Sequence, residues 1–182
     1  MQVTGAEFDA KDVPDGALHL AVYQIRKADL PRLEGLDRVK IRSLELRWVS
    51  MPDLTVIPLP ETLETLLVWQ SPKLKRLDGL EQAQGLRQLT WQDNGPLEDA
   101  DALAKLPDLK VLRLEGGMNK RQKLASLDVL NRLALEELVL GGVAPHSLDV
   151  APILTLDGLK RISILGSDLD IASMAVLAAR FP

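Results

Sequence analysis

One spacing of apolar residues recurs along most of the chain and limits what the chain can fold into. Two leucine-like residues stand three positions apart, a third follows two positions later, and this L-x-x-L-x-L pattern begins again after 22 to 26 residues. A repeat of this length buries its apolar side only against neighbouring repeats, so the spacing predicts a solenoid. Six clear copies and one weaker first copy begin at Ile41, Leu63, Leu86, Leu109, Leu135, Leu159 and, for the weaker one, Ala17.

The competing architecture is a doubly wound sheet built from βαβ units. Each such unit needs about 30 residues or more, which is longer than the period of this chain. The second half of the motif alternates with period two, as in a strand whose alternate side chains point inward. One short strand and a tight return segment therefore fill each repeat, and successive strands run parallel.

The pattern resembles that of the leucine-rich repeat family, L-x-x-L-x-L-x-x-N/C-x-L, over roughly residues 17–170. The resemblance implies an α/β solenoid of about seven turns, with a parallel concave β-sheet and short helical or irregular convex segments. In the family the Asn side chain binds backbone from turn to turn, and here only Asn94 occupies that place. We therefore expect Ser, Gly and water to carry the other turns. Their equivalent residues are Ile25, Val49, Ser71, Gly117, Val143 and Ser167.

The two ends of a solenoid need caps, because each end exposes core. Residues 1–16 are polar with scattered apolar residues, and we expect them to form an N-terminal cap or tail. Residues 17–167 hold the repeats. Residues 168–182 are expected to form a capping helix, since Asp168–Phe181 has an amphipathic pattern.

The segments that return from one strand to the next differ in character. Residues 30–39, 96–106 and 124–133 are expected to form one or two helical turns, whereas residues 50–60 carry three prolines and are expected to be extended. Glycines that follow the strands are expected to adopt positive φ in turns. These are Gly116, Gly117, Gly141, Gly142 and Gly166.

The composition excludes several classes of function. The chain has no cysteine, which removes disulfides, thiolate metal sites and a cysteine nucleophile. His19 and His146 lie in different repeats without metal-ligand spacing, so we expect no catalytic residue, metal or cofactor. The net charge is -4 and the basic stretches are short, which argues against a nucleic-acid partner.

The chain also lacks the signals of membrane insertion and export. No apolar run approaches the roughly 18 residues that suggest a membrane span. The first 16 residues have neither the basic nor the apolar region of a signal peptide. We therefore expect a cytoplasmic protein that does not contact a membrane.

The candidate site lies on the concave sheet, where side chains between and after the inward leucines point outward in rows. Trp, Tyr and Arg most often carry binding energy at interfaces, and they gather over the first three repeats. Trp91 falls on an inward position and is expected in the core. The candidate partner-binding residues are Tyr23, Glu45, Arg47, Trp48, Leu67, Trp69, Gln92, Arg113 and Glu115.

A second interpretation gives these side chains a purely structural role. Exposed aromatic rings can cover neighbouring strands, and Glu45 can pair with Arg47, or Arg113 with Glu115, for a few tenths of a kcal/mol. A contiguous exposed apolar patch more often marks an interaction site, and the cluster of Tyr, Trp and Arg therefore favours binding.

The resemblance implies a non-enzymatic scaffold that docks a partner protein on the concave sheet. The acidic composition favours a basic partner, as for a bacterial immunity protein or antitoxin that covers a basic effector. One alternative is a self-associating structural module that pairs through the terminal helix around Ile171, Met174 and Leu177, although we expect a monomer. Another is an enzyme that uses carboxylates or His19 on the same face, but the outward rows lack a convergent polar group.

Overall fold

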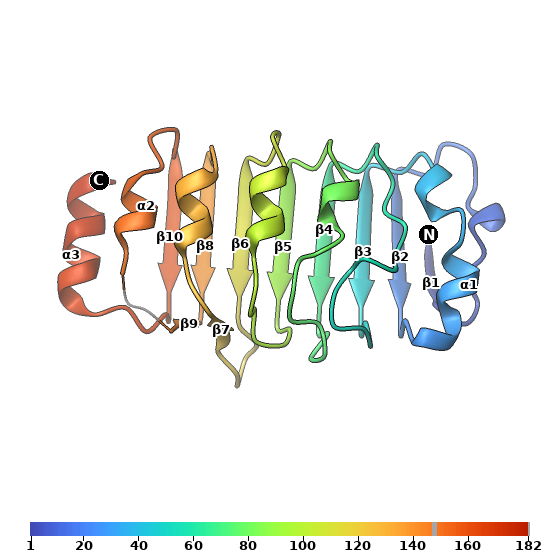
Figure 1. The fold of residues 1–182 in the computed structure, drawn as a ribbon, viewed down its shortest axis with the longest axis horizontal. Coiled ribbons are helices and arrows are strands. Elements are labelled where there is room, and N and C mark those ends of the chain that lie inside the picture. The colour runs from blue at the N-terminus through green and yellow to red at the C-terminus, as the bar shows by residue number, and fades with distance from the viewer. Residues whose placement is uncertain (147–148, 182) are drawn as a thin grey trace.

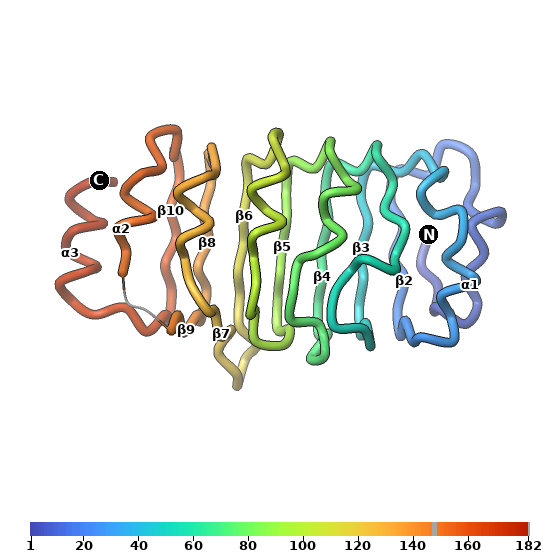
Figure 2. The backbone as a smooth tube through the Cα atoms, in the orientation of Figure 1, coloured from blue at the N-terminus to red at the C-terminus, as the bar shows by residue number. Residues whose placement is uncertain are grey.

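The computed structural model describes residues 1–146 and 149–181 and shows a regular coil of strands and return segments. Figure 2 shows the chain passing from strand to return segment once per turn, with the two termini at opposite ends of the molecule. All strand pairs of the main sheet are parallel. Its eight strands are, in spatial order, β1 (Gln2–Thr4), β2 (His19–Tyr23), β3 (Ser43–Arg47), β4 (Thr65–Trp69), β5 (Gln88–Gln92), β6 (Val111–Glu115), β8 (Glu137–Gly141) and β10 (Arg161–Leu165).

The return segments form a second layer on one side of the sheet (Figure 1). Helical turns lie within residues 30–39, 96–106 and 124–133, as predicted, while residues 50–60 contain neither helix nor strand. A small second sheet pairs β7 (Gln122–Leu124) with β9 (Val143–Pro145). The short helices are α1 (Leu30–Leu33) and α2 (Ala151–Leu154), with 3-10 turns at Ala10–Asp12, Lys27–Asp29, Leu36–Arg38, Leu80–Gln82, Asp101–Lys105 and Asp128–Arg132.

The hydrophobic core lies between the two layers and runs the length of the molecule. The middle leucine of the first six motifs points inward and is almost completely buried, because its strand alternates sides with period two. Trp91 also occupies an inward position and has no exposed surface, as predicted. The row of middle leucines consists of Leu20, Leu44, Leu66, Leu89, Leu112 and Leu138.

The two ends are covered differently. At the N-terminal end, β1 adds an edge strand to β2, and Phe8 is fully buried behind it. At the other end, α3 (Ile171–Arg180) covers the core with Leu177, and the Asp170 carboxylate accepts the backbone N–H of Ser173 at 2.7 Å. The boundaries 1–16, 17–167 and 168–182 stay predictions. Residues 147–148 and Pro182, which fall in the last two of these segments, lie outside the described residues.

A polar ladder replaces the row of asparagines expected of a regular repeat. The Val49 N–H donates to Ser71 Oγ at 3.0 Å, and the Ser71 N–H donates to Asn94 Oδ1 at 2.8 Å. The Asn94 N–H in turn donates to Gln122 Oε1 at 3.3 Å. Ser167 accepts the Val143 N–H in the same way, so serine carries two of these turns as predicted. The prediction placed Gly117 at the position that follows Asn94 in the ladder. The chain makes an extra turn at residues 116–121, so Gln122 takes that position instead.

The prediction that all five strand-end glycines adopt positive φ is wrong for three of them. Gly142 and Gly166 have φ of 58° and 62°, whereas Gly116, Gly117 and Gly141 do not adopt positive φ. At Gly116 and Gly117 a glycine is needed for another reason, because a side chain has no room there. A Cβ atom would lie 2.6 Å from the Lys120 carbonyl oxygen at Gly116, and 2.5 Å from a carboxylate oxygen of Asp93 at Gly117.

Candidate functional site

The strand register places the predicted site residues in rows on the open face of the sheet, the face opposite the return segments. Tyr23 lies beside Arg47, Arg47 beside Trp69, and the row continues through Gln92 and Glu115. A parallel row in the centre of the strands holds the other candidates. It contains Ala21, Glu45, Leu67, Thr90, Arg113, Val139 and Ser163.

One cluster over β2, β3 and β4 is formed by four of the candidates, Tyr23, Arg47, Trp48 and Trp69. The Arg47 guanidinium carbon lies 4.1 Å from the centre of the Trp69 ring and 5.0 Å from that of Tyr23, within the range of cation–π attraction. Tyr23 meets Trp48 edge to face, with ring centres 6.2 Å apart. Arg47 Nε donates to the carboxylate of Glu45, which is almost completely buried. The Glu45–Arg47 ion pair is therefore present, as the structural interpretation of these side chains predicts. The candidate Leu67 lies half-buried in the next strand, β4.

Trp48 differs from the rest of this cluster because it is exposed. Its side chain keeps 44 % of its surface, and its backbone has a φ of 53°. Each strand end from β2 to β5 adopts this left-handed conformation, through Gln24, Trp48, Gln70 and Asp93. The conformation is costly for a bulky residue, and Gly takes the position after β8 and β10. A Trp at this position therefore carries a backbone cost that a Gly would not.

A second charged group lies over β6, β8 and β10. One carboxylate oxygen of Glu137 accepts Arg113 Nη2 at 2.5 Å, and the other accepts Arg161 Nη1 at 2.5 Å. The predicted pairing of Arg113 with Glu115 is wrong, because Glu137 lies closer to the guanidinium across the ladder. Glu115 instead lies beside Gly141, where a Cβ atom would be 3.4 Å from Glu115 Cγ.

Glu137 belongs to a third outward row that the motif analysis missed. The row occupies the position directly before each middle leucine, and period-two alternation already placed it outward. His19 opens the row, and its Nδ1 lies 2.9 Å from Ser43 Oγ. The other members are Ser43, Thr65, Gln88, Val111, Glu137 and Arg161.

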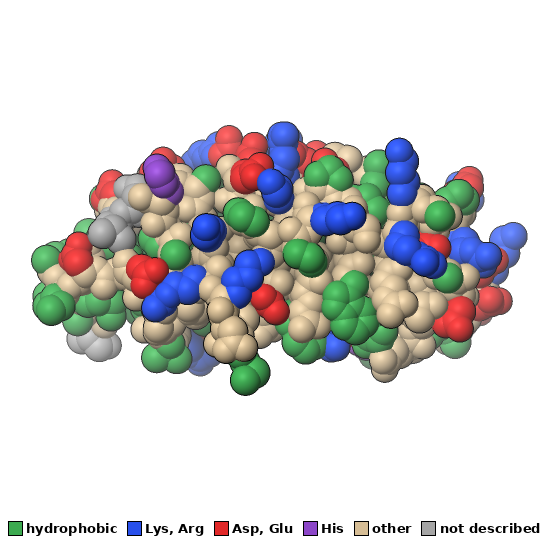
Figure 3. Space-filling view, turned by 90° about the horizontal axis from the view of Figure 1, so that it is seen from below, with side chains coloured by type: hydrophobic (Ala, Val, Ile, Leu, Met, Phe, Trp, Pro, Cys, Tyr) green, Lys and Arg blue, Asp and Glu red, His purple; other side chains and the backbone are tan. Residues whose placement is uncertain are grey.

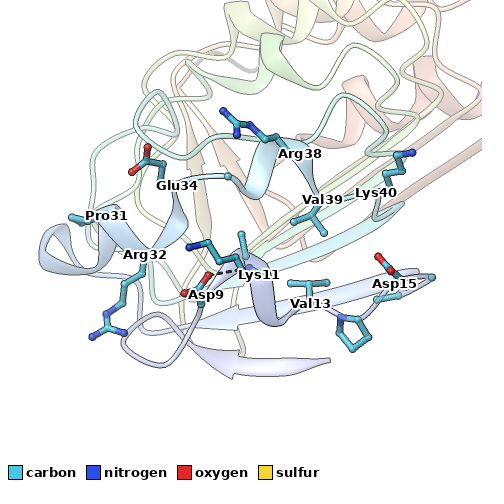
Figure 4. A pocket seen from close by; sticks show the side chains of 15 residues that line it. Asp9, Lys11, Val13, Asp15, Pro31, Arg32, Glu34, Arg38, Val39 and Lys40 are labelled. Atoms are coloured by element: carbon cyan, nitrogen blue, oxygen red, sulfur yellow. Dashed lines mark hydrogen bonds between the residues drawn. The ribbon is translucent and has the colours of Figure 1, made fainter.

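A cleft of about 750 Å³ lies away from the sheet, between residues 9–17 and residues 31–40 near the N-terminal end. Figure 4 shows charged side chains of both signs around it, and Asp9 accepts the backbone N–H of Lys11 at 2.9 Å. Its lining residues bring together no nucleophile with a general base. Within residues 1–146 and 149–181, no group of three His, Asp or Glu side chains could hold a metal ion.

The described part of the chain also contains no helix with both the length and the apolar character needed to cross a bilayer. The longest helix is α3, with 10 residues.

No protein-family model matches the sequence, and no curated protein matches it in sequence. Solved structures do resemble its fold. An internalin C2 from Listeria monocytogenes superposes with a TM-score of 0.62 at 19% sequence identity, and the match covers 88% of this chain and 67% of that protein. The parallel sheet with one strand per turn and the match to this leucine-rich repeat protein agree with the predicted architecture. The chain therefore has the fold of a leucine-rich repeat solenoid.

Proposed function

We propose that this protein is a non-enzymatic binding scaffold that docks a partner protein on the open face of its sheet. The observation that carries the proposal is the cluster of Tyr23, Arg47, Trp48 and Trp69. Aromatic and arginine side chains that are already held in place lose little conformational entropy on binding, which is typical of interface hot spots.

The rigidity of the support strengthens this interpretation. Each of these residues stands on or directly after a strand in the middle of a continuous hydrogen-bonded ladder. An array of in-register strands presents its side chains at fixed spacing, which suits recognition of another protein surface. The cytoplasm is the compartment in which we propose that the partner is found.

The test is affinity capture from a lysate of the cells that produce the protein, followed by mass spectrometry. Wild type is compared with Trp48→Asn on the open face and with Val56→Asn on the return layer. The two side chains are similarly exposed, at 44 % and 48 %, so the second variant is a matched control. The proposal expects a protein captured by wild type and Val56→Asn and lost with Trp48→Asn. Equal capture by all three forms would overturn the cluster around Trp48 as the docking site.

A second candidate function, self-association, is favoured by the outward side of α3. Of its ten residues only Leu177 is buried, and hydrophobic side chains gather at that end of the molecule (Figure 3). A helix with so apolar an outer surface is usually covered. Light scattering over a range of concentrations distinguishes the two functions, since a monomer keeps the chain mass of 20.0 kDa at all of them. The outward side of the helix is lined by Ile171, Ala172, Ala175, Val176, Ala178 and Ala179.

A further inference from the structure

We propose that the partner docks along one border of the open face, and that it presents a basic side chain flanked by apolar residues. This border, which we name the carboxyl rim, follows the carboxyl ends of β3 to β6 and the turn after β6. The inference rests on the proposed function and specifies where and by what chemistry the partner binds. The carboxyl rim consists of Trp48, Gln70, Asp93, Glu115 and Met118.

The centre of the open face offers a partner few free charges. Glu45 and Arg47 neutralise each other, and the guanidinium of Arg47 is already stacked on two rings. The Arg113 and Arg161 guanidinium groups share the carboxylate of Glu137. A partner that docked there with charged groups would have to break these pairs.

Two carboxylates on the carboxyl rim lack such partners. Among the described residues, neither Asp93 nor Glu115 forms a side-chain hydrogen bond or an ion pair. They are neighbours, because the Asp93 N–H donates to the Glu115 carbonyl oxygen at 2.9 Å. Both are half-buried, and each lies beside a glycine, Gly117 and Gly141 respectively. A Cβ atom at Gly117 would lie 2.5 Å from the Asp93 carboxylate, so this glycine gives the carboxylate its room at the rim.

Exposed apolar side chains flank this acidic pair on both sides. Trp48 lies two strands away from Asp93 and is 44 % exposed. On the other side, the connection between β6 and β7 reaches beyond the ends of the neighbouring strands (Figure 1), and its Met118 is fully exposed. Figure 3 looks onto this edge of the sheet and shows hydrophobic and charged side chains interleaved along it.

The dimensions of the rim fit a short stretch of polypeptide. Strands in a sheet are spaced by about 4.8 Å, so three spacings separate β3 from β6 by about 14 Å. An extended segment of about four residues covers that length. A guanidinium or ammonium group at its middle would reach the two carboxylates while an apolar neighbour rests on Trp48, and charge-assisted hydrogen bonds would hold it.

The test uses a phage-displayed library of short random peptides, selected on immobilised wild-type protein. Binding of the selected peptides is then measured by fluorescence anisotropy. The rim variants are Trp48→Asn and the double variant Asp93→Asn/Glu115→Gln, which removes charge without changing size. The matched control is Thr90→Lys, at a half-buried position in the centre of the same face. Circular dichroism establishes that each variant is folded.

The expected result is that selected peptides contain more Arg and Lys than the unselected library. Their affinity falls by about tenfold or more on the double variant, falls on Trp48→Asn, and is unchanged on Thr90→Lys. Raising the salt concentration weakens binding to wild type but not to the double variant. Peptides no more basic than the library, or equal affinity for the double variant, overturn the inference.

The same variants separate this inference from the function on which it rests. If Thr90→Lys abolishes binding while the rim variants do not, the partner docks at the centre of the open face. The proposed function then stands and the carboxyl rim is wrong. If no variant on the open face changes binding, both proposals fail.

Discussion

Trp48 combines three properties that rarely occur together in one residue: a bulky ring, exposure and a left-handed backbone. The left-handed conformation costs about 1–2 kcal/mol for a residue with a Cβ atom, and Asn tolerates it better than most. The edge-to-face contact with Tyr23 returns about 0.5–1.5 kcal/mol. These two terms nearly cancel, so Trp48 adds little to folding.

We therefore expect Trp48→Asn to change the free energy of unfolding by less than about 1 kcal/mol, since relief of the backbone offsets the lost ring contact. Trp91→Ala serves as the control, because Trp91 is fully buried and its truncation should cost about 3–5 kcal/mol. Urea denaturation followed by circular dichroism measures both. A loss for Trp48→Asn as large as that for Trp91→Ala would show that Trp48 is a structural residue.

Asn94 is the residue on which the polar ladder depends. It is 1 % exposed, and its amide accepts the Ser71 N–H at 2.8 Å and donates to the Val68 carbonyl oxygen at 2.9 Å. Asn94→Ala removes the acceptor of the buried Ser71 N–H and one donor to the Val68 carbonyl oxygen, which should lower the free energy of unfolding by about 1–3 kcal/mol. The exposed Asn119→Ala is the control for the same denaturation experiment. Equal effects of the two substitutions would contradict a structural role for the ladder.

Among the elements, α3 depends on its N-cap residue Asp170, which directly precedes the helix. The backbone N–H of Ser173, followed by its side chain, holds the pKa of Asp170 below its ordinary value of 3.8. A carboxyl with a lowered folded-state pKa stabilises the fold above its unfolded pKa, and this contribution is lost as the pH falls through the folded value.

We expect Asp170→Ala to increase hydrogen exchange of the first amides of α3 at neutral pH, because the helix loses its N-terminal cap. In wild type the same loosening should develop only at acidic pH, as the pH falls through the lowered pKa of the folded-state carboxyl and the carboxylate becomes protonated. Exchange measured by NMR at several pH values tests both statements. Asp15→Asn, an exposed carboxyl at the other end of the molecule, should leave these amides unchanged. Equal protection in Asp170→Ala and wild type would exclude the cap.

For the whole molecule, stability comes from contacts between adjacent turns, as in other solenoids. The central strands have a neighbour on each side, and their inward residues are fully buried, such as Leu66 and Leu89. The last strand, β10, has one strand neighbour, and its inward residues Ile162 and Ile164 stay partly exposed. The C-terminal end of the coil is therefore weaker than its centre.

Native-state hydrogen exchange should show this gradient directly. Amides of β4, β5 and β6 are expected to exchange only through global unfolding, whereas those of β10 exchange through local opening at the end of the coil. Leu177→Ala, which removes the buried contact of α3, should widen the difference without affecting the central strands. Protection of β10 equal to that of β5 would contradict the gradient.

The register of the sheet was predictable because it follows from local chemistry. A period near 23 residues admits one strand per turn, and period-two alternation assigns every strand residue to a side. For this reason the rows through Tyr23, Arg47 and Trp69, and the burial of Trp91, could be predicted without coordinates.

The coil, its repeat and the side on which each side chain stands thus follow from local sequence, because these depend on neighbours within one turn. Which side chains of different turns meet depends instead on packing between the turns. The preference of Arg113 for Glu137 over Glu115 and the entry of Gln122 into the ladder depend on how adjacent turns are offset. Such offsets come from packing between turns that are more than 20 residues apart in the sequence, so no local pattern encodes them.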